Sequence, residues 1–492
     1  MERNRRLEIL PSEELLPKGE MKRPEGIREQ RKAIGGFERT WEEYIPTGYD
    51  GKRALPLVIS LHGGAKYTMA YKSSWAKVAE RENFIVVFGH SLAEGKIRWN
   101  AWREFTKEDG FPDDVEYLDE VIACVKRSYR IDGTRIYLHG QSVGDKMAST
   151  YLFERSEQFA AAACLSGPMG ASCFVNQEGN VFYGPVGKVP IIRRHGAEDV
   201  DIPLRFNRID IKREPGSPIT EKHRRDKMTA HQVINNWLWR QRNECEDLPW
   251  LAVRGKYNLA VYPGNPYDFW YYAENASGHS PGLDMADDIW SYFFTGYRRV
   301  NGQAVRTAPS RPLRPDEGCT AAASGSALAY VNHKKVPLDS SGNPAVMREG
   351  VLCVPAPFME TALGAEVRIE GGQVWIRCCG RELQAAKGNH GVVFDCHYRE
   401  MGPCFEENGM LYLPLAGTAR FFGYRPLEGY EAVYVTKEDG TLSYDLAYLI
   451  RQILGVEKEP TPKECLDTEN RLAEEWIMSG GMEYDRSTLP KN

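Results

Sequence analysis

Short apolar runs alternate with longer stretches of helical spacing between Trp41 and about residue 300. Runs of this length, without polar interruption, are typical of strands that are buried on both faces of a sheet. Strand and helix alternation over this length predicts an α/β fold, a mainly parallel sheet with helices on both faces. The apolar runs lie at 55–61, 84–88, 135–139, 160–165, 189–192 and 258–262.

The stretch after Asp114 illustrates the helical pattern. Its apolar residues recur at steps of three and four, which places them on one face of a helix. Asp114 stands where the N-cap of such a helix is expected. The apolar positions are Val115, Leu118, Ile122, Val125 and Tyr129.

Changes in composition divide the chain into five parts. Residues 1–40 are polar and rich in Arg, Glu and Pro, and we expect a loosely packed extension. The α/β domain follows over 41–300. Residues 301–325 are rich in Arg, Pro, Gly and Ser and predict a linker. We expect a smaller α+β domain over 326–436, and a helical tail over 437–492.

The smaller domain contains an internal repeat. Gly-Val-Leu-Cys-Val-Pro at 350–355 is matched by Gly-Met-Leu-Tyr-Leu-Pro at 409–414, and each proline is followed nine residues later by a glycine, Gly364 or Gly423. Each unit predicts a short strand that ends at the proline, one or two helical turns, and a glycine that stops the helix. Three landmarks at one offset indicate a true repeat.

Composition and charge exclude several functional classes. The formal net charge is −5, so there is no electrostatic case for a nucleic acid or an anionic membrane as a partner. No apolar run approaches the roughly 18 residues that a membrane-spanning helix needs. The first residues are basic without a following apolar segment, so the sequence predicts no signal peptide.

The main chemical motif is Gly-Gln-Ser-Val-Gly at 140–144, centred on Ser142. It directly follows the apolar run 135–139 and precedes a stretch with helix-forming composition, 146–153. A nucleophile elbow requires this strand–turn–helix context, because small residues let the turn tighten and expose the serine hydroxyl. The alternative is a serine that only caps the helix.

An acid for this serine is predicted after the run 189–192, within His-Gly-Ala-Glu-Asp-Val-Asp at 195–201. Asp199 is the preferred candidate, since the acid of a Ser–His–acid triad belongs in a loop at a strand end. Glu198 and Asp201 remain alternatives, and any of the three could be an ordinary surface acid.

A base is predicted at His279, which lies in a Gly-, Ser- and Pro-rich loop after the aromatic run 269–273. A histidine in such a loop can bridge a serine and an acid at neighbouring strand ends. His62 and His195 also stand beside glycines at strand ends, where they could be structural hydrogen-bonding groups. The order along the chain, serine then acid then histidine, favours His279.

The developing oxyanion needs backbone donors, and the sequence offers two places for them. Leu-His-Gly-Gly-Ala at 61–65 ends an early strand with glycines, and we place one N–H donor at Gly64, with Ala65 as the alternative. The second donor is the N–H of Val143. No metal or organic cofactor is needed for this chemistry.

Three aromatic residues could line a pocket for the acyl group of a substrate: Trp99, Trp102 and Phe105. An equally open alternative is that they pack in the hydrophobic core.

Five segments of the α/β domain carry a family resemblance: LVISLHGG (57–64), WNAW (99–102), the stretch 113–144, HGAEDVDIP (195–203) and GHSPG (278–282). On these segments residues 41–298 resemble the polyhydroxybutyrate depolymerase and feruloyl esterase group of α/β-hydrolases. The resemblance implies hydrolysis of esters of hydroxy-acid polymers, of feruloylated or acetylated polysaccharides, or of related small esters. It also implies Asp199 as the acid and His279 as the base. Asp145 departs from the family pattern, which commonly has glycine there, and we expect it to alter the rim of the acyl site.

Residues 326–436 resemble the repeat domain named after the N-terminal domain of copper amine oxidases, on Gly-x-x-x-Val-Pro at 350–355 and Ala-Leu-Gly-Ala-Glu-Val at 362–367. The resemblance implies a binding or spacer module and no copper, since no His/Cys cluster stands there. Both resemblances point outside the cell, whereas the missing signal peptide and the odd number of cysteines, 11, favour the inside. Two other functions stay open: a serine peptidase of related fold, and a non-catalytic binding protein.

Overall fold

A mixed sheet forms the centre of the first domain in the computed structural model, which describes residues 26–64, 69–92, 99–103, 110–181, 187–204, 209–211, 216–282 and 284–479. Within these residues ten strands pair in the order β1-β2-β4-β3-β5-β6-β7-β12-β11-β10. The middle strands, from β4 through β12, run parallel, and antiparallel pairs flank them on both sides. The predicted α/β fold class is therefore confirmed.

The apolar runs of the sequence coincide with the buried middle strands. β3 and β4 are buried along their whole length, as expected for strands with both faces covered by helices. The strands of this sheet are β1 (Ile27–Ile34), β2 (Phe37–Tyr44), β3 (Leu55–Leu61), β4 (Ile85–Gly89), β5 (Ile131–Gln141), β6 (Ala161–Leu165), β7 (Ile191–Gly196), β10 (Trp250–Arg254), β11 (Tyr257–Tyr262) and β12 (Phe269–Glu274).

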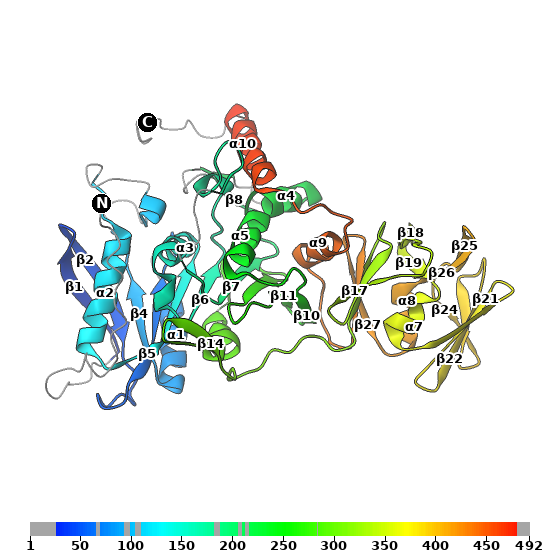
Figure 1. The fold of residues 1–492 in the computed structure, drawn as a ribbon, viewed down its shortest axis with the longest axis horizontal. Helices are drawn as coiled ribbons and strands as arrows, with labels where there is room; N and C mark the ends of the chain where they lie inside the picture. Colours follow the sequence, from blue (N-terminus) through cyan, green and yellow to red (C-terminus); the bar gives the residue numbers. More distant parts are fainter. Residues whose placement is uncertain are drawn as a thin grey trace.

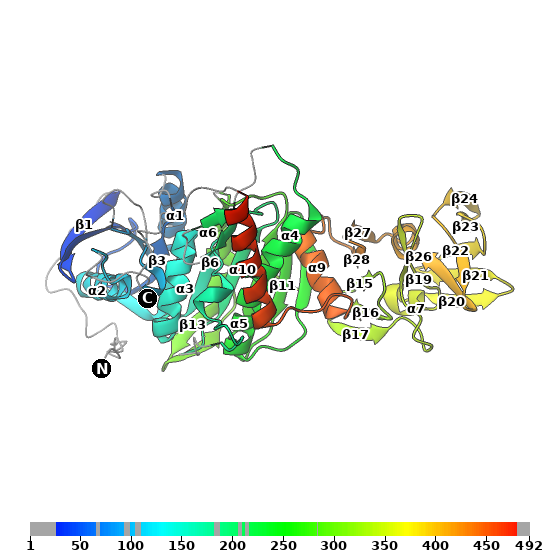
Figure 2. The same cartoon turned by 90° about the horizontal axis from the view of Figure 1, so that it is seen from above.

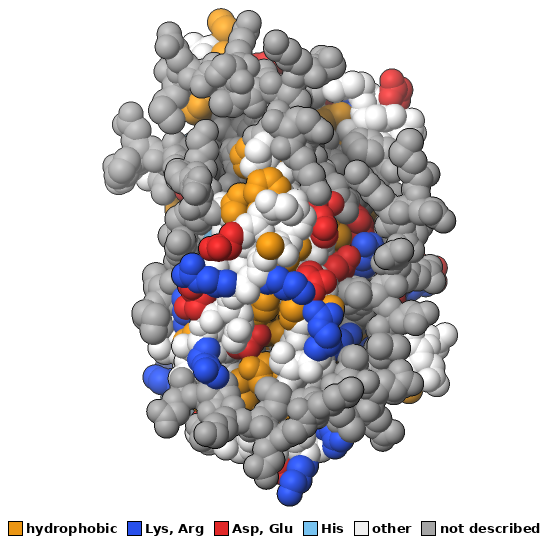
Figure 3. Space-filling model, turned by 90° about the vertical axis from the view of Figure 1, so that its left-hand side faces the viewer, with side chains coloured by type: hydrophobic (Ala, Val, Ile, Leu, Met, Phe, Trp, Pro, Cys, Tyr) orange, Lys and Arg blue, Asp and Glu red, His pale blue; other side chains and the backbone are white. Residues whose placement is uncertain are grey.

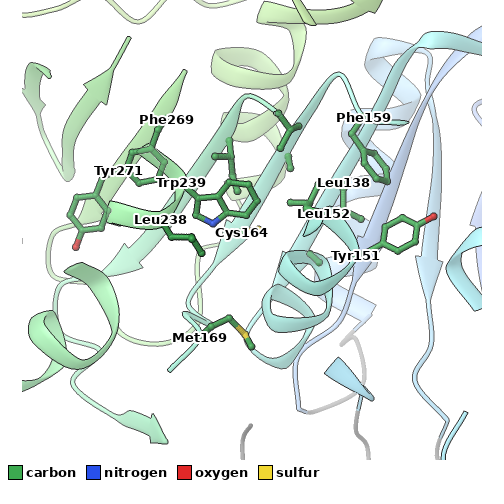
Figure 4. Close-up of a cluster of buried hydrophobic side chains, with 14 of the residues drawn as sticks. Leu138, Tyr151, Leu152, Phe159, Cys164, Met169, Leu238, Trp239, Phe269 and Tyr271 are labelled. Atoms are coloured by element: carbon green, nitrogen blue, oxygen red, sulfur yellow. The ribbon is translucent and has the colours of Figure 1, made fainter. Parts of the chain in front are cut away.

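Helices cover both faces of this sheet. On one face lie α2 (Asp114–Ser128), α3 (Val143–Arg155) and α5 (Ile234–Asn243), and on the other lie α1 (Met69–Glu82), α6 (Met285–Asp288) and the π-helix η6 (Ile289–Phe293). Alternate residues of β12 face the two cores: Tyr271 belongs to the first and Tyr272 to the second. Figure 4 shows part of the first core, where side chains of α3 and α5 pack against the strands.

Residues 27–40 are part of the sheet and do not form the loose extension that their polar composition suggested. They supply β1 and the first half of β2, which pair with each other, and β2 also pairs with β4. Arg39 of β2 is buried and forms an ion pair of 2.6 Å with Asp114. Asp114 is therefore not the N-cap of α2. Asp113 takes that role, and its side chain accepts hydrogen bonds from Val115 and Glu116 N–H.

The surface at the β1–α2 end of the molecule carries charges of both signs side by side (Figure 3). Glu120 of α2 illustrates the pairing, since it contacts Lys32 of β1 at 2.5 Å and Arg127 of its own helix at 2.7 Å. Exposed pairs of this kind contribute little to stability.

The smaller domain consists of antiparallel sheets around its own core. The predicted repeat is present in the structure: β19 and β26 pair antiparallel, and each is followed by a short helix, α7 or α8. Gly364 ends α7 in a left-handed conformation, as expected. The elements are β15 (Thr320–Ala323), β16 (Leu328–Val331), β17 (Lys334–Pro337), β18 (Val346–Arg348), β19 (Val351–Pro355), α7 (Phe358–Leu363), β20 (Glu366–Glu370), β21 (Gln373–Cys378), β22 (Arg381–Ala386), β23 (Gly391–Phe394), β24 (His397–Glu400), β25 (Phe405–Glu407), β26 (Met410–Pro414), α8 (Leu415–Phe421), β27 (Arg425–Gly429) and β28 (Ala432–Thr436).

After the smaller domain the chain returns to the α/β domain. Figures 1 and 2 show α9 (Tyr444–Ile453) and α10 (Pro462–Met478) beside the α/β domain, away from the far sheets of the smaller one. Asp445 of α9 accepts a hydrogen bond of 2.8 Å from Tyr271 of β12. Glu469 of α10 is buried and accepts hydrogen bonds from Ser172 N–H at 3.0 Å and Oγ at 2.7 Å. The smaller domain is thus inserted between parts of the first.

The predicted linker contains short strands of its own. β14 (Gln303–Arg306) lies within it and forms a hairpin with β13 (Tyr297–Val300), which precedes the linker. β15 already belongs to the smaller domain before residue 325. No helix among the described residues is both long and apolar enough to cross a membrane.

Replacing Glu469 by alanine tests whether α10 is docked on the α/β domain through Ser172. The change leaves the N–H and hydroxyl of Ser172 without this acceptor, so we expect the free energy of unfolding to fall by about 1–3 kcal/mol. Urea unfolding of Glu469→Ala and Glu469→Gln measures it, and the glutamine variant should lose less because its amide oxygen still accepts. Equal stability of Glu469→Ala and wild type would contradict the docking of α10 on the first domain.

Candidate active site

Ser142 stands at the turn between β5 and α3, in a strained backbone conformation. Its φ is 56° and its ψ is −121°, a region that residues with a side chain seldom occupy. Its N–H donates a hydrogen bond of 2.7 Å to Leu165 O at the end of β6. The turn is thus fixed from the neighbouring strand, as a nucleophile elbow requires.

The glycines of the motif are required by close contacts between backbone segments. A Cβ at Gly140 would overlap the carbonyl oxygen of Gly144, and a Cβ at Gly144 would overlap the carbonyl oxygens of Leu61 and His62. Gly167 lies equally close, since a Cβ there would overlap Ser142 O. Only glycine fits at these positions without moving the backbone.

The structure brings Ser142, His279 and Asp199 together. His279 Nε2 lies 2.9 Å from Ser142 Oγ, and His279 Nδ1 lies 2.9 Å from Asp199 Oδ2. The three residues follow β5, β7 and β12, whose carboxyl ends meet at one edge of the sheet. The imidazole is half-exposed, with 47% of its side chain accessible, while the Asp199 side chain is 2% exposed. Solvent or a ligand can therefore reach the serine–histidine end of the relay.

Asp199 stays ionised despite its burial. Burial by itself would raise its pKa, but the charge of Lys227 and the hydrogen bond from His279 together hold the pKa well below its ordinary value. The two alternative acids have other surroundings. Glu198 points outward and pairs with Arg224 at 3.0 Å, and the backbone carbonyl of Asp201 accepts a hydrogen bond from Lys227. Neither the Glu198 nor the Asp201 carboxylate forms a hydrogen bond with His279.

His62 and His195 are buried, each within a hydrogen-bond network of its own. His62 Nε2 accepts from Ser91 N–H at 3.1 Å. His195 Nδ1 lies 3.0 Å from Gln232 Nε2, and burial together with the charge of Lys227 lowers the pKa of His195 to about 3. Both fit the alternative of structural hydrogen-bonding groups.

Asp145 lies beneath the elbow and not at the rim of the acyl site, so that prediction was wrong. Its side chain is fully buried and forms an ion pair of 3.1 Å with Arg193 of β7. It also accepts a hydrogen bond of 2.9 Å from Gly167 N–H. The carboxylate turns inward because a buried arginine and the N–H of Gly167 face it there.

Two backbone segments flank Ser142 Oγ. Val143 is the first residue of α3, so its N–H has no acceptor within the helix. On the other side Gly63 lies close, since a Cβ there would be 3.1 Å from Ser142 Cβ, whereas no atom lies within 4 Å of a Cβ at Gly64. Sequence reasoning did not select Gly63, although it is the first glycine of the same motif. Ala65 lies outside the described residues.

Of the aromatic candidates, Trp99 belongs to the core. It is 2% exposed, and its Nε1–H donates a hydrogen bond of 3.0 Å to His62 O, which leaves no surface for a substrate. Trp102 is half-buried and packs on Phe153 with its ring centroids 5.0 Å apart. Its Nε1–H lies 3.0 Å from Met169 Sδ. Phe105 lies outside the described residues.

The described residues contain no group of three or more His, Cys, Asp or Glu side chains arranged to hold a metal ion. A serine, a histidine and an aspartate at these distances form an arrangement that is able to carry out acyl transfer.

Comparison with known proteins matches this region to one family. Residues 40–230 match the family described as Esterase PHB depolymerase. Curated relatives include the bifunctional acetylxylan esterase/xylanase XynS20E of Neocallimastix patriciarum, 26% identical over 251 residues, which cover 48% of this chain and 30% of that protein. Another is poly(3-hydroxyalkanoate) depolymerase C of Paucimonas lemoignei, 25% identical over 130 residues, covering 25% of this chain and 30% of that protein. The match thus spans less than a third of either relative.

Solved structures that the comparison matches include an acetyl xylan esterase from Aspergillus awamori, 14% identical with a TM-score of 0.39, covering 53% of this chain and 97% of that one. A second is the poly(3-hydroxybutyrate) depolymerase LpqC from Bordetella parapertussis, 16% identical with a TM-score of 0.37, covering 54% of this chain and 89% of that one. None of these comparisons identifies the smaller domain, so its resemblance stays a prediction.

Replacing Gly144 by alanine tests the close packing of the elbow. The added Cβ meets backbone atoms that cannot rotate away, so we expect a loss of about 1–3 kcal/mol in the free energy of unfolding. Gly296→Ala is the matched control, because a Cβ at Gly296 meets only Pro309 at 3.7 Å. Urea unfolding of both variants gives the comparison, and equal losses would argue against the tight turn.

The lowered pKa of Asp199 predicts a pH-dependent contribution to stability. The carboxylate stabilises the folded protein above the ordinary pKa of aspartate, about 4, and this stabilisation is lost as the pH falls toward the lower folded pKa. The stability difference between wild type and Asp199→Asn should therefore shrink as the pH falls from about 6 to 3. Urea unfolding across this range measures it, with Glu198→Gln as the control for a neighbouring acid. If the stability difference between wild type and Asp199→Asn does not change with pH, the pKa of Asp199 is not lowered in the folded protein.

Proposed function

We propose that this chain, whose residues 40–230 match the esterase PHB depolymerase family, is a serine carboxylic ester hydrolase that acts through an acyl-enzyme. The observation that carries the proposal is the continuous relay from Ser142 Oγ through His279 to Asp199, with both hydrogen-bonded distances at 2.9 Å. A serine hydroxyl becomes an effective nucleophile only when a base in this position takes its proton.

In the first half of the reaction Ser142 Oγ forms a bond to the ester carbonyl carbon while its proton moves to His279 Nε2. Asp199 orients the imidazole and stabilises the imidazolium. The bond to the alcohol oxygen then breaks, and the alcohol leaves with the proton from His279. In the second half His279 takes a proton from water while the water oxygen bonds to the acyl carbon. The bond between the acyl carbon and Ser142 Oγ then breaks, His279 returns the proton to Ser142 Oγ, and the acid product leaves.

Backbone donors stabilise the negative oxygen of each tetrahedral intermediate. We assign one to the N–H of Val143, which points from the first turn of α3, and the other to the loop of Gly63 and Gly64. Gly64 remains the donor that the sequence favours. Because these donors are part of the backbone, they are in place before the charge develops.

The substrates we propose are acetyl or feruloyl esters of polysaccharides, or hydroxyalkanoate polyesters. The names of the curated relatives support the acetylated polysaccharides and the hydroxyalkanoate polyesters, and the feruloyl esters rest on the sequence resemblance alone. Trp102 is the aromatic side chain that we propose to contact the substrate, since it is half-buried and lies against Met169, close to the end of β6. The smaller domain is proposed as a binding or spacer module.

Hydrolysis of p-nitrophenyl acetate, p-nitrophenyl butyrate and methyl ferulate by wild type and Ser142→Ala tests the proposal. We expect measurable turnover of at least one ester by wild type and a loss of 10³-fold or more in kcat, as an order of magnitude, for the variant, because the hydroxyl forms the acyl-enzyme. Ser149→Ala is a control for the loss of a nearby buried hydroxyl on α3.

A wild-type protein that cleaves none of the esters would contradict the proposal, and so would full activity in Ser142→Ala. A peptide panel run beside the esters separates an esterase from a serine peptidase of the same fold. Labelling of Ser142 by a fluorophosphonate separates both from a binding protein without catalysis.

A further inference from the structure

Arg194 lies at the end of β7, beside the loop that carries His279. Its side chain has no exposed surface, although it bears a full charge. Arginine stays protonated when buried, so a guanidinium in this place must be neutralised and its N–H groups must find acceptors. The contacts that satisfy it converge on the residues around the catalytic histidine.

One side of the guanidinium binds the histidine loop itself. Nη1 donates to the backbone carbonyls of Gly278 at 3.3 Å and His279 at 3.4 Å. Nη2 donates to the hydroxyl of Ser277. The three acceptors are consecutive residues, so the guanidinium holds the backbone of the loop at the histidine and just before it.

The other side of the guanidinium is anchored to the sheet. Nε and Nη2 both donate to Glu274 Oε2 at the end of β12, at 2.8 and 2.6 Å. Nη1 also donates to Ser166 Oγ at 2.6 Å, just after β6. The Glu274 carboxylate is itself fixed, because its second oxygen lies 2.9 Å from Lys256 Nζ.

Backbone contacts bring the histidine loop and the acid loop together at the same place. Glu198, which directly precedes Asp199, donates a backbone N–H hydrogen bond of 2.9 Å to Ser277 O. A Cβ at Gly196 would overlap the carbonyls of Ser277 and Gly278, so the loop rests directly on the end of β7. Ser166 precedes Gly167, which lies against Ser142 O. Arg194 therefore joins the ends of β6, β7 and β12. Asp199 and His279 follow β7 and β12, and the turn after β6 lies against Ser142.

We propose that Arg194 is a positioning residue that fixes the His279 loop in register with Ser142 and Asp199. This inference rests on the proposed ester-hydrolase function of the relay. A loop would otherwise move more than the strands it connects. The planar fork of arginine can bind a carboxylate, two hydroxyls and backbone carbonyls at once, whereas the single ammonium of lysine cannot span them. Arg194 does not touch the reacting atoms, and it acts by keeping both nitrogens of His279 at hydrogen-bond distance from their partners.

The test compares Arg194→Lys with Arg299→Lys. Arg299 is a matched control because it too is buried and donates to backbone carbonyls, of Phe159, Lys188 and Gly302, none of which belongs to the relay or its loops. Three quantities are measured for each: the melting temperature, kcat and KM for p-nitrophenyl acetate, and the downfield proton NMR resonance of the His279 Nδ1–H bonded to Asp199.

We expect both variants to lose some thermal stability, but only Arg194→Lys to lose kcat, by about 10- to 100-fold with KM unchanged, since a small displacement of a catalytic group has such effects. Its downfield resonance should weaken or vanish, while Arg299→Lys keeps it. Ser277→Ala, which removes one anchor of the loop, provides a milder variant that folds if Arg194→Lys does not. It should lose kcat in the same direction, and less.

A folded Arg194→Lys with wild-type kcat and an unchanged downfield resonance would overturn the positioning role, and so would equal loss of kcat in Arg299→Lys. The proposed function fails in a different way. If wild type hydrolyses no ester, but its downfield resonance depends on Arg194 and not on Arg299, then the ester-hydrolase proposal is wrong and the positioning of His279 by Arg194 stands.

Discussion

The close approach of three backbone segments around Ser142 is the constraint on which the rest of the site depends. The end of β3, the start of α3 and the turn after β6 meet with no room for a Cβ at Gly144 or Gly167. This contact imposes the strained conformation of Ser142 and turns its hydroxyl toward His279. Strain of this kind persists only where the surrounding structure over-determines it. Here the well-packed sheet and helices beneath the turn supply that support.

Buried charge supports the same edge of the sheet from below. Arg193 and Arg194 are neighbours on β7 and point to opposite faces, where each meets one buried carboxylate, Asp145 or Glu274. Such pairs add little net stability, because desolvation of both charges offsets their attraction. Their geometry is nevertheless strict, since an unpaired buried charge is costly. The two pairs therefore fix the relative positions of α3, β7 and β12 more than they stabilise the fold.

The sequence could predict the sheet, the repeat and the meeting of Ser142, Asp199 and His279 at strand ends, because these follow from periodicity and from local motifs. Their chemical roles stay predictions. The sequence could not predict that Arg39 is buried in the sheet, because a polar segment with charges of both signs is also typical of an exposed terminal extension. The role of Arg194 could not be predicted for a related reason. Its hydrogen-bond partners lie up to 85 residues away in the sequence, and no local pattern predicts these contacts.

The smaller domain is inserted within the sequence of the α/β domain, and this affects the order in which the protein folds during synthesis. Helices α9 and α10 pack against the α/β domain, yet they are synthesised only after the whole inserted domain. Elements that contact each other across such a separation form late, because a long loop must close first. On the ribosome the inserted domain can complete its own core earlier. Until α9 emerges, the Tyr271 hydroxyl lacks the carboxylate of Asp445, and the incomplete α/β domain exposes apolar surface that chaperones can bind.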